Sequence, residues 1–466
     1  MAEESGLKKV LGFKELLSIG IGQTIGSGVM AYTGIAIGIT GRGVVIAYIL
    51  SSLLVILITM PAAQLSSTLP CAGAEYMHTS RILSPTLGTF YMFIYFIYTM
   101  TISVYAISFT EYLQQLIPSI PFKLIAVSVL TIFYIANIVG IQMAAAIQKI
   151  LVLALFAGLF VFIVFGLPHV ELSGFTSETM YPEGFKGVFG AAALLTFATG
   201  GANVITHLGA EAKNPGRDIP IVMAIATILV GIVYAFLAFV ASGILPVEEV
   251  ANKNLGVVAQ VFLSRPAYLF FMIGGAMTAI ITTLNSTFSW VTKPLLMFVE
   301  DGYLPKKLGE VNKRFGTPHY LLTVFYILGL LPVITGVSLS AISTIGSCAM
   351  LFRVLIPVCS CFLVHKKYPD ACAKSFFLFK PAVLYVTVGI ASIILLIQMG
   401  VLLDMQTTFM IYVSLITVLC AFIISVVINK IRKVDFYTGN AETDFRQTTV
   451  QTTPAHNDKS KKQETD

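Results

Sequence analysis

Long apolar stretches follow one another along almost the whole chain and are separated by short polar segments. A helix of about 20 apolar residues is long enough to cross the hydrocarbon core of a bilayer, so each stretch predicts a transmembrane helix. The stretches lie near residues 13–38, 43–66, 87–113, 121–141, 144–167, 187–209, 219–245, 267–293, 319–337, 341–364, 381–402 and 407–430. The pattern predicts an all-α membrane protein with twelve transmembrane helices and both termini on one side.

Composition and charge agree with this prediction and orient the chain. Only 11% of the residues are charged, against about 25% in soluble domains. Of the 29 basic residues, twenty-three fall on the side of the termini, five fall on the other side, and Arg353 falls inside the tenth span. Because cytoplasmic loops carry the excess of Lys and Arg, we expect a cytoplasmic N-terminus over residues 1–12 and, over the polar residues 434–466, a disordered cytoplasmic tail. The net charge of +6 reflects orientation and gives no reason to expect a nucleic-acid partner.

The first span is interrupted by the run Gly22-Gln23-Thr24-Ile25-Gly26-Ser27-Gly28. In hydrocarbon every backbone group must be bonded internally, so three glycines and several polar side chains there predict a helix that opens. Free N–H groups near Ser27 and free carbonyls near Thr24 would suit the carboxylate and the ammonium group of a zwitterion. The alternative is a tight packing face, because Gly22 and Gly26 also form a small-xxx-small pattern.

A second interruption lies in the sixth span, where Phe197-Ala198-Thr199-Gly200-Gly201-Ala202-Asn203 combines two glycines with an amide. Five spans separate the two interruptions. An odd number of spans places two repeats in opposite orientations, as in transporters built from inverted repeats. We therefore expect a first repeat over residues 13–167 (helices 1–5), a second over residues 187–364 (helices 6–10), and helices 11 and 12 over residues 381–430.

Other candidate chemistry is sparse. His207 and Glu211 are one helical turn apart and could share a proton or a metal ion, but a hydrogen bond at the helix end is the favoured interpretation. The chain has no His-Glu-x-x-His motif, no phosphate-binding glycine loop and no serine-elbow motif, and no filter-like segment typical of a channel. We expect no enzyme activity, no catalytic residue, no cofactor and no resident metal.

Four places along the chain carry patterns of one transporter family. They are Gly26-Ser27-Gly28-Val29, the run from Pro70 to Tyr76 (PCAGAEY), the run from Glu211 to Pro220 (EAKNPGRDIP), and the run from Glu300 to Pro305 (EDGYLP) with Phe315 to His319 (FGTPH). In order and spacing, residues 10–430 resemble amino acid permeases of the amino acid, polyamine and organocation (APC) superfamily. The resemblance implies a LeuT-like fold of two inverted five-helix repeats plus two C-terminal helices, and amino acid transport across the plasma membrane by alternating access.

The resemblance also implies a substrate site at the two interruptions. The family's carboxylate site falls on the backbone of Ser27 and Gly28, its ammonium site on carbonyls of Thr24, Phe197 and Gly200, and its aromatic lid on Phe197. Ser103 in the third span and Thr287 in the eighth are expected to line the side-chain pocket. The remaining candidate substrate-binding residues are Ile25, Gly26, Ala198, Gly201 and Asn203, and the gating or selectivity candidates are Arg353 and Tyr95.

Two departures from the family pattern bear on mechanism. Proton-coupled members carry a lysine midway along the fifth span, where this chain has Val152-Leu153-Ala154-Leu155-Phe156, and Lys149 lies nearer the cytoplasmic end. Exchange or facilitated flux is therefore ranked first. A sodium symporter, with Thr283, Ser286 or Thr287 as ligands, and a proton symporter remain alternatives.

The second departure concerns the substrate. Exchangers of basic amino acids carry an acidic residue where this chain has Asn203, and no acidic side chain is expected within the two breaks. Arg353 is costly inside a span, so it must bond carbonyls, form a gate or contact substrate. We expect a neutral amino acid as substrate, with acidic ones next. The rival from another class is a sensor on the same fold that binds amino acids without moving them.

Overall fold

The computed structural model describes residues 7–337, 339–404, 408–433 and 435–445, and most of these residues lie in helices. Within these ranges there is no β-strand, and two isolated β-bridges join Leu11 to Ala212 and Ala72 to Leu208. The helices of the first half are α1 (Phe13–Thr24), α2 (Ser27–Thr40), α3 (Val44–Thr68), α5 (Pro85–Thr99), α6 (Ile102–Leu116), α7 (Phe122–Ile138) and α8 (Ile141–Gly166). The expectation of an all-α protein is confirmed for the described residues.

The second half is also built from helices. Its main members are α10 (Gly184–Thr199), the 3-10 helix η5 (Gly201–His207), α11 (Pro215–Ile244), α14 (Arg265–Phe270), the π-helical η6 (Phe271–Met277), α15 (Thr278–Trp290), α16 (Thr292–Glu300), α17 (His319–Thr335), α18 (Leu339–Cys359), α19 (Cys361–Lys367), α21 (Pro381–Asp404) and α22 (Thr408–Arg432). Short helices lie in the connections: α4 (Ala74–His78) and the π-helical η2 (Thr79–Leu83) between α3 and α5, and α9 (Ser177–Met180), α12 (Val247–Val250), α13 (Leu255–Phe262), α20 (Pro369–Ala373) and α23 (Ala441–Asp444) elsewhere.

Eight helical segments of the described residues are long and apolar enough to cross a membrane. Two more apolar helices, α7 and α17, are shorter. One of the eight segments extends over 41 residues from Gly28 to Thr68 and takes in both α2 and α3, which are joined by a 3-10 turn at Gly41–Gly43. Two separate spans are expected there from the sequence. A multi-pass membrane protein is confirmed, while the number twelve remains a prediction.

The first predicted break is present between α1 and α2. Ile25 and Gly26 are extended, with φ and ψ of −83° and 93° and of −121° and −159°. The alternative interpretation, a tight packing face, applies to Gly22, because a Cβ there would lie 1.7 Å from Nε2 of Gln148. Close packing therefore explains Gly22, whereas the chain opens at Ile25 and Gly26.

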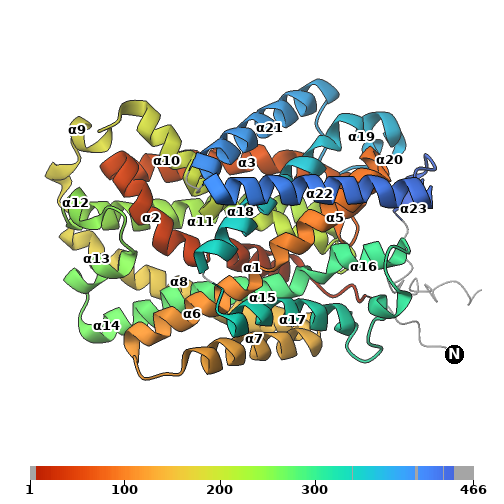
Figure 1. Ribbon diagram of the computed structural model, residues 1–466. Helices are drawn as coiled ribbons and strands as arrows, with labels where there is room; N and C mark the ends of the chain where they lie inside the picture. Colours follow the sequence, from red (N-terminus) through yellow and green to blue (C-terminus); the bar gives the residue numbers. More distant parts are fainter. Residues whose placement is uncertain (1–6, 338, 405–407, 434, 446–466) are drawn as a thin grey trace, which may run out of the picture.

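The second predicted break is present between α10 and η5, and it contacts the first. A Cβ on Gly201 would lie 2.6 Å from Cα of Thr24, so only glycine permits this approach of the two chains. The half-helix α1 packs against η5, α8, α11 and α15, and Figure 1 shows it in the middle of the bundle. The two breaks thus meet at the centre of the protein.

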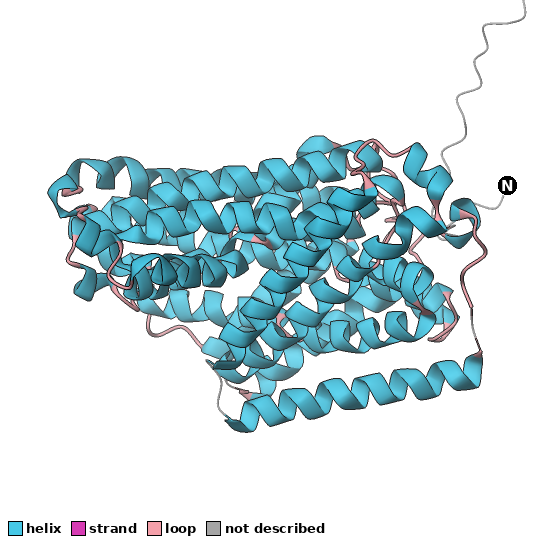
Figure 2. Cartoon of the chain, turned by 90° about the horizontal axis from the view of Figure 1, so that it is seen from above, coloured by secondary structure: helices cyan, strands magenta, loops and turns pink. Residues whose placement is uncertain are grey.

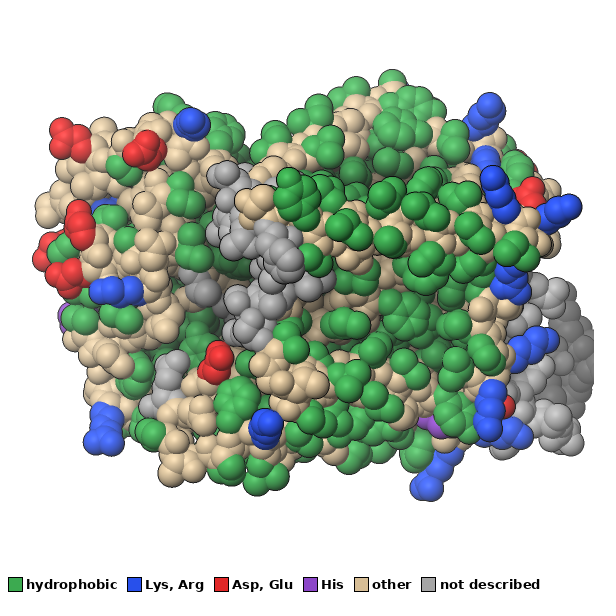
Figure 3. Space-filling view, viewed as in Figure 1, with side chains coloured by type: hydrophobic (Ala, Val, Ile, Leu, Met, Phe, Trp, Pro, Cys, Tyr) green, Lys and Arg blue, Asp and Glu red, His purple; other side chains and the backbone are tan. Residues whose placement is uncertain are grey.

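Charged side chains gather at the two ends of the molecule. In Figure 3 most of the visible basic side chains lie at the end where Figure 1 shows α16 and α19, and most of the acidic ones lie at the opposite end. The end of α22 and the short helix α23 lie at this same basic end (Figure 1). α22 itself runs along the outside of the bundle (Figure 2) and packs against α5 and α18.

Part of the expected disordered tail is ordered. Residues 435–445 include α23 and the buried side chain of Asp444, which accepts a hydrogen bond from Tyr368. Composition did not indicate this, because the segment is polar and its contacts come from distant parts of the chain. Residues 434 and 446–466 of the same expected tail lie outside the described residues.

Candidate functional site

A cavity of about 210 Å³ lies where the two helix breaks meet. Of the predicted site residues it is lined by Thr24, Gly26, Gly28, Phe197, Ala198 and Thr283. Its other lining residues are Gln23, Tyr32, Tyr98, Thr101, Val104, Tyr105, Gly346 and Met350. None of these side chains carries a charge, so the cavity presents backbone, hydroxyl, amide and apolar groups.

The N-terminus of α2 faces this cavity. The first turn of a helix has N–H groups without an intrahelical partner and carries the positive end of the helix dipole. Here that turn begins at Ser27, its N-cap Gly26 has no side-chain capping bond, and Gly28 lines the cavity. A Cβ on Gly28 would lie 3.4 Å from Tyr32 and 3.5 Å from Ala198. The site therefore offers room and electrostatic attraction for a carboxylate.

The carbonyl groups at the end of α1 are partly occupied by side chains. Thr24 O accepts a bond from Tyr234 Oη at 3.3 Å, and Ile25 O accepts from Thr282 Oγ1 and Thr283 Oγ1 at 3.4 Å each. These bonds are long, and each carbonyl oxygen has two lone pairs. Thr24 O, which accepts one bond, therefore retains capacity to accept from an ammonium group.

Several predicted site residues lie outside the cavity lining. Ser103 is buried and donates to Met100 O at 2.8 Å. Gly200 and Asn203 line a separate space of about 40 Å³ on the other side of Phe197. Ile25 and Gly201 lie at the contact between the breaks.

The hydroxyl groups of α15 bond the half-helix α1. Thr283 Oγ1 donates to Gly22 O at 3.0 Å, Ser286 Oγ to Ile19 O at 3.1 Å, and Thr287 Oγ1 to Gln23 Oε1 at 3.2 Å. Gln148 of α8 lies in the same interface and donates to Thr282 O at 3.1 Å. The residues considered as sodium ligands therefore stabilise the broken helix by direct hydrogen bonds.

The third predicted span supplies the cavity wall opposite the breaks. It bends at Met100, between α5 and α6, and Tyr98, Thr101 and Tyr105 line the cavity there. Tyr95, one turn before Tyr98, is buried and donates to Val291 O at 2.6 Å.

Arg353 is not an unpaired charge. Its Nη1 donates to Oε2 of Glu75 at 3.0 Å, and both side chains are buried. Its guanidinium lies 4.8 Å from the ring centroid of Tyr98 and 5.4 Å from that of Trp290. The sequence offered only one signal for Glu75, an acidic residue in an apolar connection.

The Glu75 carboxylate joins four elements. Besides Arg353 of α18, it accepts from Tyr91 Oη of α5 at 2.6 Å and from Asn203 Nδ2 of η5 at 3.4 Å, and His207 Nε2 lies 3.4 Å away. Burial raises the pKa of Glu75, but Arg353 and His207 outweigh burial and hold that pKa at about 2. The carboxylate is therefore ionised at neutral pH.

His207 and Glu211, which were considered as a pair that could share a proton, contact different partners. His207 stacks on Trp290, with ring centroids 5.3 Å apart, and its Nε2 faces Glu75. Glu211 forms a buried ion pair with Lys293 at 2.9 Å. The helix η5 ends at His207, so Glu211 lies in the turn that follows it, and the four-residue spacing of an α-helix does not bring the two side chains together.

This polar cluster lies one helical turn from the cavity, toward the basic end. Met350 lines the cavity and Arg353 follows it along α18. Trp290 Nε1 donates to Oε1 of the cavity residue Gln23 at 2.9 Å. The ion pair and the aromatic rings around it therefore fill the space between the cavity and that end.

Comparison with known proteins identifies the family that this chain matches. Residues 11–438 match the sequence model of a family described as amino acid permease. The chain is 24% identical over 396 residues to the branched-chain amino acid permease BcaP of Bacillus subtilis (strain 168), which covers 79% of this chain and 83% of that protein. It is 24% identical over 412 residues to the methylthioribose transporter of the same organism, which covers 84% and 88%.

A third relative is the cationic amino acid transporter 1 of Arabidopsis thaliana, 25% identical over 334 residues, which covers 67% of this chain and 55% of that protein. These relatives are permeases and transporters, not enzymes.

Proposed function

Because the chain belongs to the amino acid permease family, we propose that it carries amino acids across the plasma membrane by alternating access. The proposal includes twelve transmembrane helices in a LeuT-like arrangement, with the repeats and cytoplasmic termini expected from the sequence. The observation that carries it is the cavity at the two breaks, where the N-terminus of α2 meets carbonyls of α1. Broken helices that bind a substrate through their ends are the transporter arrangement for such a site.

Neutral amino acids are the proposed substrates. The residues that line the cavity have no charged side chain, so a charged substrate side chain would lose hydration without gaining a counter-ion. The relative that carries branched-chain amino acids supports the same choice. Acidic amino acids rank second, and their case is weaker than the sequence suggests because Arg353 is already paired with Glu75.

Exchange or facilitated flux is the proposed mode of transport. The hydroxyls of Thr283, Ser286 and Thr287 are used as donors to α1, and a neutral amide, Gln148, lies between α1 and α15. Lys149 points elsewhere and pairs with Glu15. Sodium or proton coupling is the alternative outcome of the same assay.

Glu75 and Arg353 form the proposed cytoplasmic gate. They come from different elements, and their ion pair lies on the route from the cavity to the basic end. For substrate to leave on that side, the contacts among α4, η5 and α18 must separate. Arg353 thus acts as a gate residue that does not touch the substrate in this state.

Uptake of labelled amino acids into proteoliposomes tests the function. We expect saturable uptake of neutral amino acids that internal unlabelled substrate stimulates and that persists when sodium is replaced and ionophores collapse the gradients. Saturable binding without flux under every imposed gradient would instead identify a sensor. Best competition by arginine or lysine at neutral pH would contradict the proposed substrate class.

A further inference from the structure

The tail segment of residues 435–445 folds back onto the basic end of the bundle. Asp444 of α23 is only 6% exposed. Its carboxylate accepts a hydrogen bond from Tyr368 Oη at 2.8 Å and further bonds from the backbone N–H and the hydroxyl of Thr438. The neighbouring Phe445 packs against the rings of Tyr368 and His78. A segment so enclosed is part of the folded protein.

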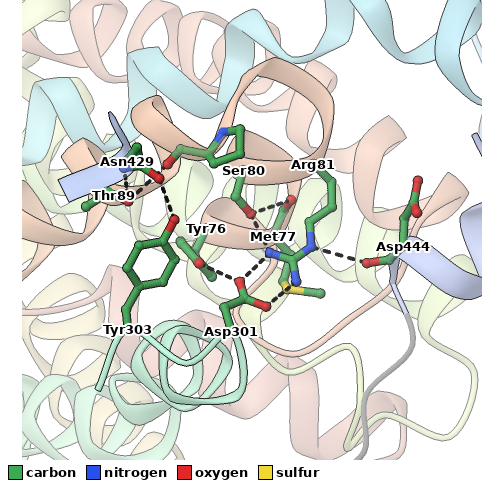
Figure 4. Close-up of polar contacts among 10 residues, drawn as sticks. Tyr76, Met77, Ser80, Arg81, Thr89, Asp301, Tyr303, Asn429 and Asp444 are labelled. Carbon is green, nitrogen blue, oxygen red and sulfur yellow. Dashed lines mark hydrogen bonds and ion pairs between the residues drawn. The ribbon is translucent and has the colours of Figure 1, made fainter. Parts of the chain in front are cut away.

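The same segment contacts Arg81, as Figure 4 shows. Arg81 Nε donates to the main-chain carbonyl of Asp444 at 3.2 Å, and the two Nη atoms of Arg81 bond the Asp301 carboxylate at 2.5 Å each. The guanidinium also lies 4.3 Å from the ring centroid of Phe436. Arg81 therefore ties the tail to the connection between α16 and α17.

The tail is bonded to both segments that carry the gate. Arg81 belongs to η2, which continues from α4, the helix of Glu75. Tyr368 directly follows α19, which continues from α18, the helix of Arg353. One short segment therefore links, from outside, the two elements whose separation would break the Glu75–Arg353 pair.

We propose that residues 435–445 form a strap that holds the cytoplasmic gate closed and so slows transport. Opening the gate requires α4 and α18 to move apart, and this movement stretches or releases the contacts at Asp444. The strap rests on the proposed transport function for its effect on flux, but its effect on the gate can be measured without any substrate.

Cys71 is a built-in reporter of the gate. It lies four residues before Glu75 and is 1% exposed. In a background where Cys348, Cys359, Cys361, Cys372 and Cys420 are replaced by Ser, a membrane-impermeant maleimide applied to inside-out vesicles reports access to Cys71 from the cytoplasmic side. The rate of labelling then measures the population of the open gate.

Asp444→Asn and Tyr368→Phe test the strap without deleting it. Loss of one hydrogen bond of typical net strength changes an equilibrium by about fivefold, so each variant should label about fivefold faster. Glu442→Gln is the matched control, because Glu442 lies on the same helix and is exposed. In a chain truncated after Lys433, Cys71 should be labelled faster still. In a chain truncated after Phe445, it should be labelled at the rate of the full chain.

The strap proposal would be overturned if Asp444→Asn, Tyr368→Phe and the chain truncated after Lys433 were all labelled at the same rate as the full chain, or more slowly. Measuring the exchange of a neutral amino acid in the same variants separates the strap proposal from the proposed transport function. Faster labelling with faster exchange supports both. Faster labelling in a protein that moves no amino acid keeps the strap as a feature of the fold and rejects transport.

Discussion

Glu75 accepts a hydrogen bond from Arg353 at 3.0 Å across a sequence separation of 278 residues. A charge inside a span is costly, and Glu75 supplies the buried counter-ion of Arg353. The pair also removes the reason for assigning Arg353 to substrate recognition, because its guanidinium is already engaged.

Neutralising both members of the pair should cost less stability than the two single neutralisations added together. An uncompensated buried charge costs about 3–5 kcal/mol, so Glu75→Gln and Arg353→Gln should each lower the thermal unfolding midpoint in detergent markedly. The double variant should lose less stability than the sum of the single variants, as expected for residues in contact. Glu310→Gln, at an exposed position, is the control. Strict additivity of the two effects would show that the pair is not coupled.

Gly28→Leu should abolish substrate binding while expression and folding persist. A Cβ at this position meets Tyr32 and Ala198 at ordinary contact distances, so Gly28→Ala should retain most binding, whereas the longer side chain of Leu fills the approach to the N–H groups of α2. Equilibrium binding of labelled neutral amino acid to purified protein measures the difference. Unchanged affinity in the Leu variant would refute the placement of the carboxylate.

Thr283→Val should slow transport equally with and without sodium. The change removes a donor to Gly22 O, and an unsatisfied buried acceptor costs about 1–3 kcal/mol, which loosens α1 against α15. Thr227→Val is a suitable control, because Thr227 bonds only within its own helix, to Met223 O. If sodium stimulates the wild type and this stimulation disappears in Thr283→Val, Thr283 is a sodium ligand and the exchange assignment is wrong.

His78 should make stability depend on pH. Burial lowers the pKa of His78 to about 4, below the value of about 6.5 in an unfolded chain. The unfolded state thus binds more protons between these values, so the contribution of neutral His78 is complete above pH 6.5 and is lost as pH falls toward 4. At about 1.4 kcal/mol per pH unit, the loss between pH 7 and pH 5 is about 2 kcal/mol.

The measurement is the thermal unfolding midpoint of the wild type and of His78→Gln at both pH values. His78→Gln should reduce the fall in midpoint on acidification, and replacement of the exposed His169 by Gln should leave that fall unchanged. Identical falls in all three proteins would show that His78 is not responsible.

The sequence by itself predicted the features that depend on local pattern. Apolar length predicted the membrane helices, Lys and Arg placement predicted the orientation, and clustered glycines predicted both helix breaks, because hydrocarbon penalises unbonded backbone wherever it occurs. The motifs at residues 26–29 and 70–76 led to the family.

Only the tertiary structure decided which side chains meet. Glu75 and Arg353 lie 278 residues apart, and no periodicity relates a short connection to the middle of a distant helix. The spacing of His207 and Glu211 left open a shared proton, but η5 ends at His207, and the two side chains contact Glu75 and Lys293 respectively. The tail segment of residues 435–445 is a further example. Its composition indicates disorder, but contacts with Tyr368 and Arg81 order it. Contacts between distant segments depend on how the helices pack, and packing is a property of the whole chain.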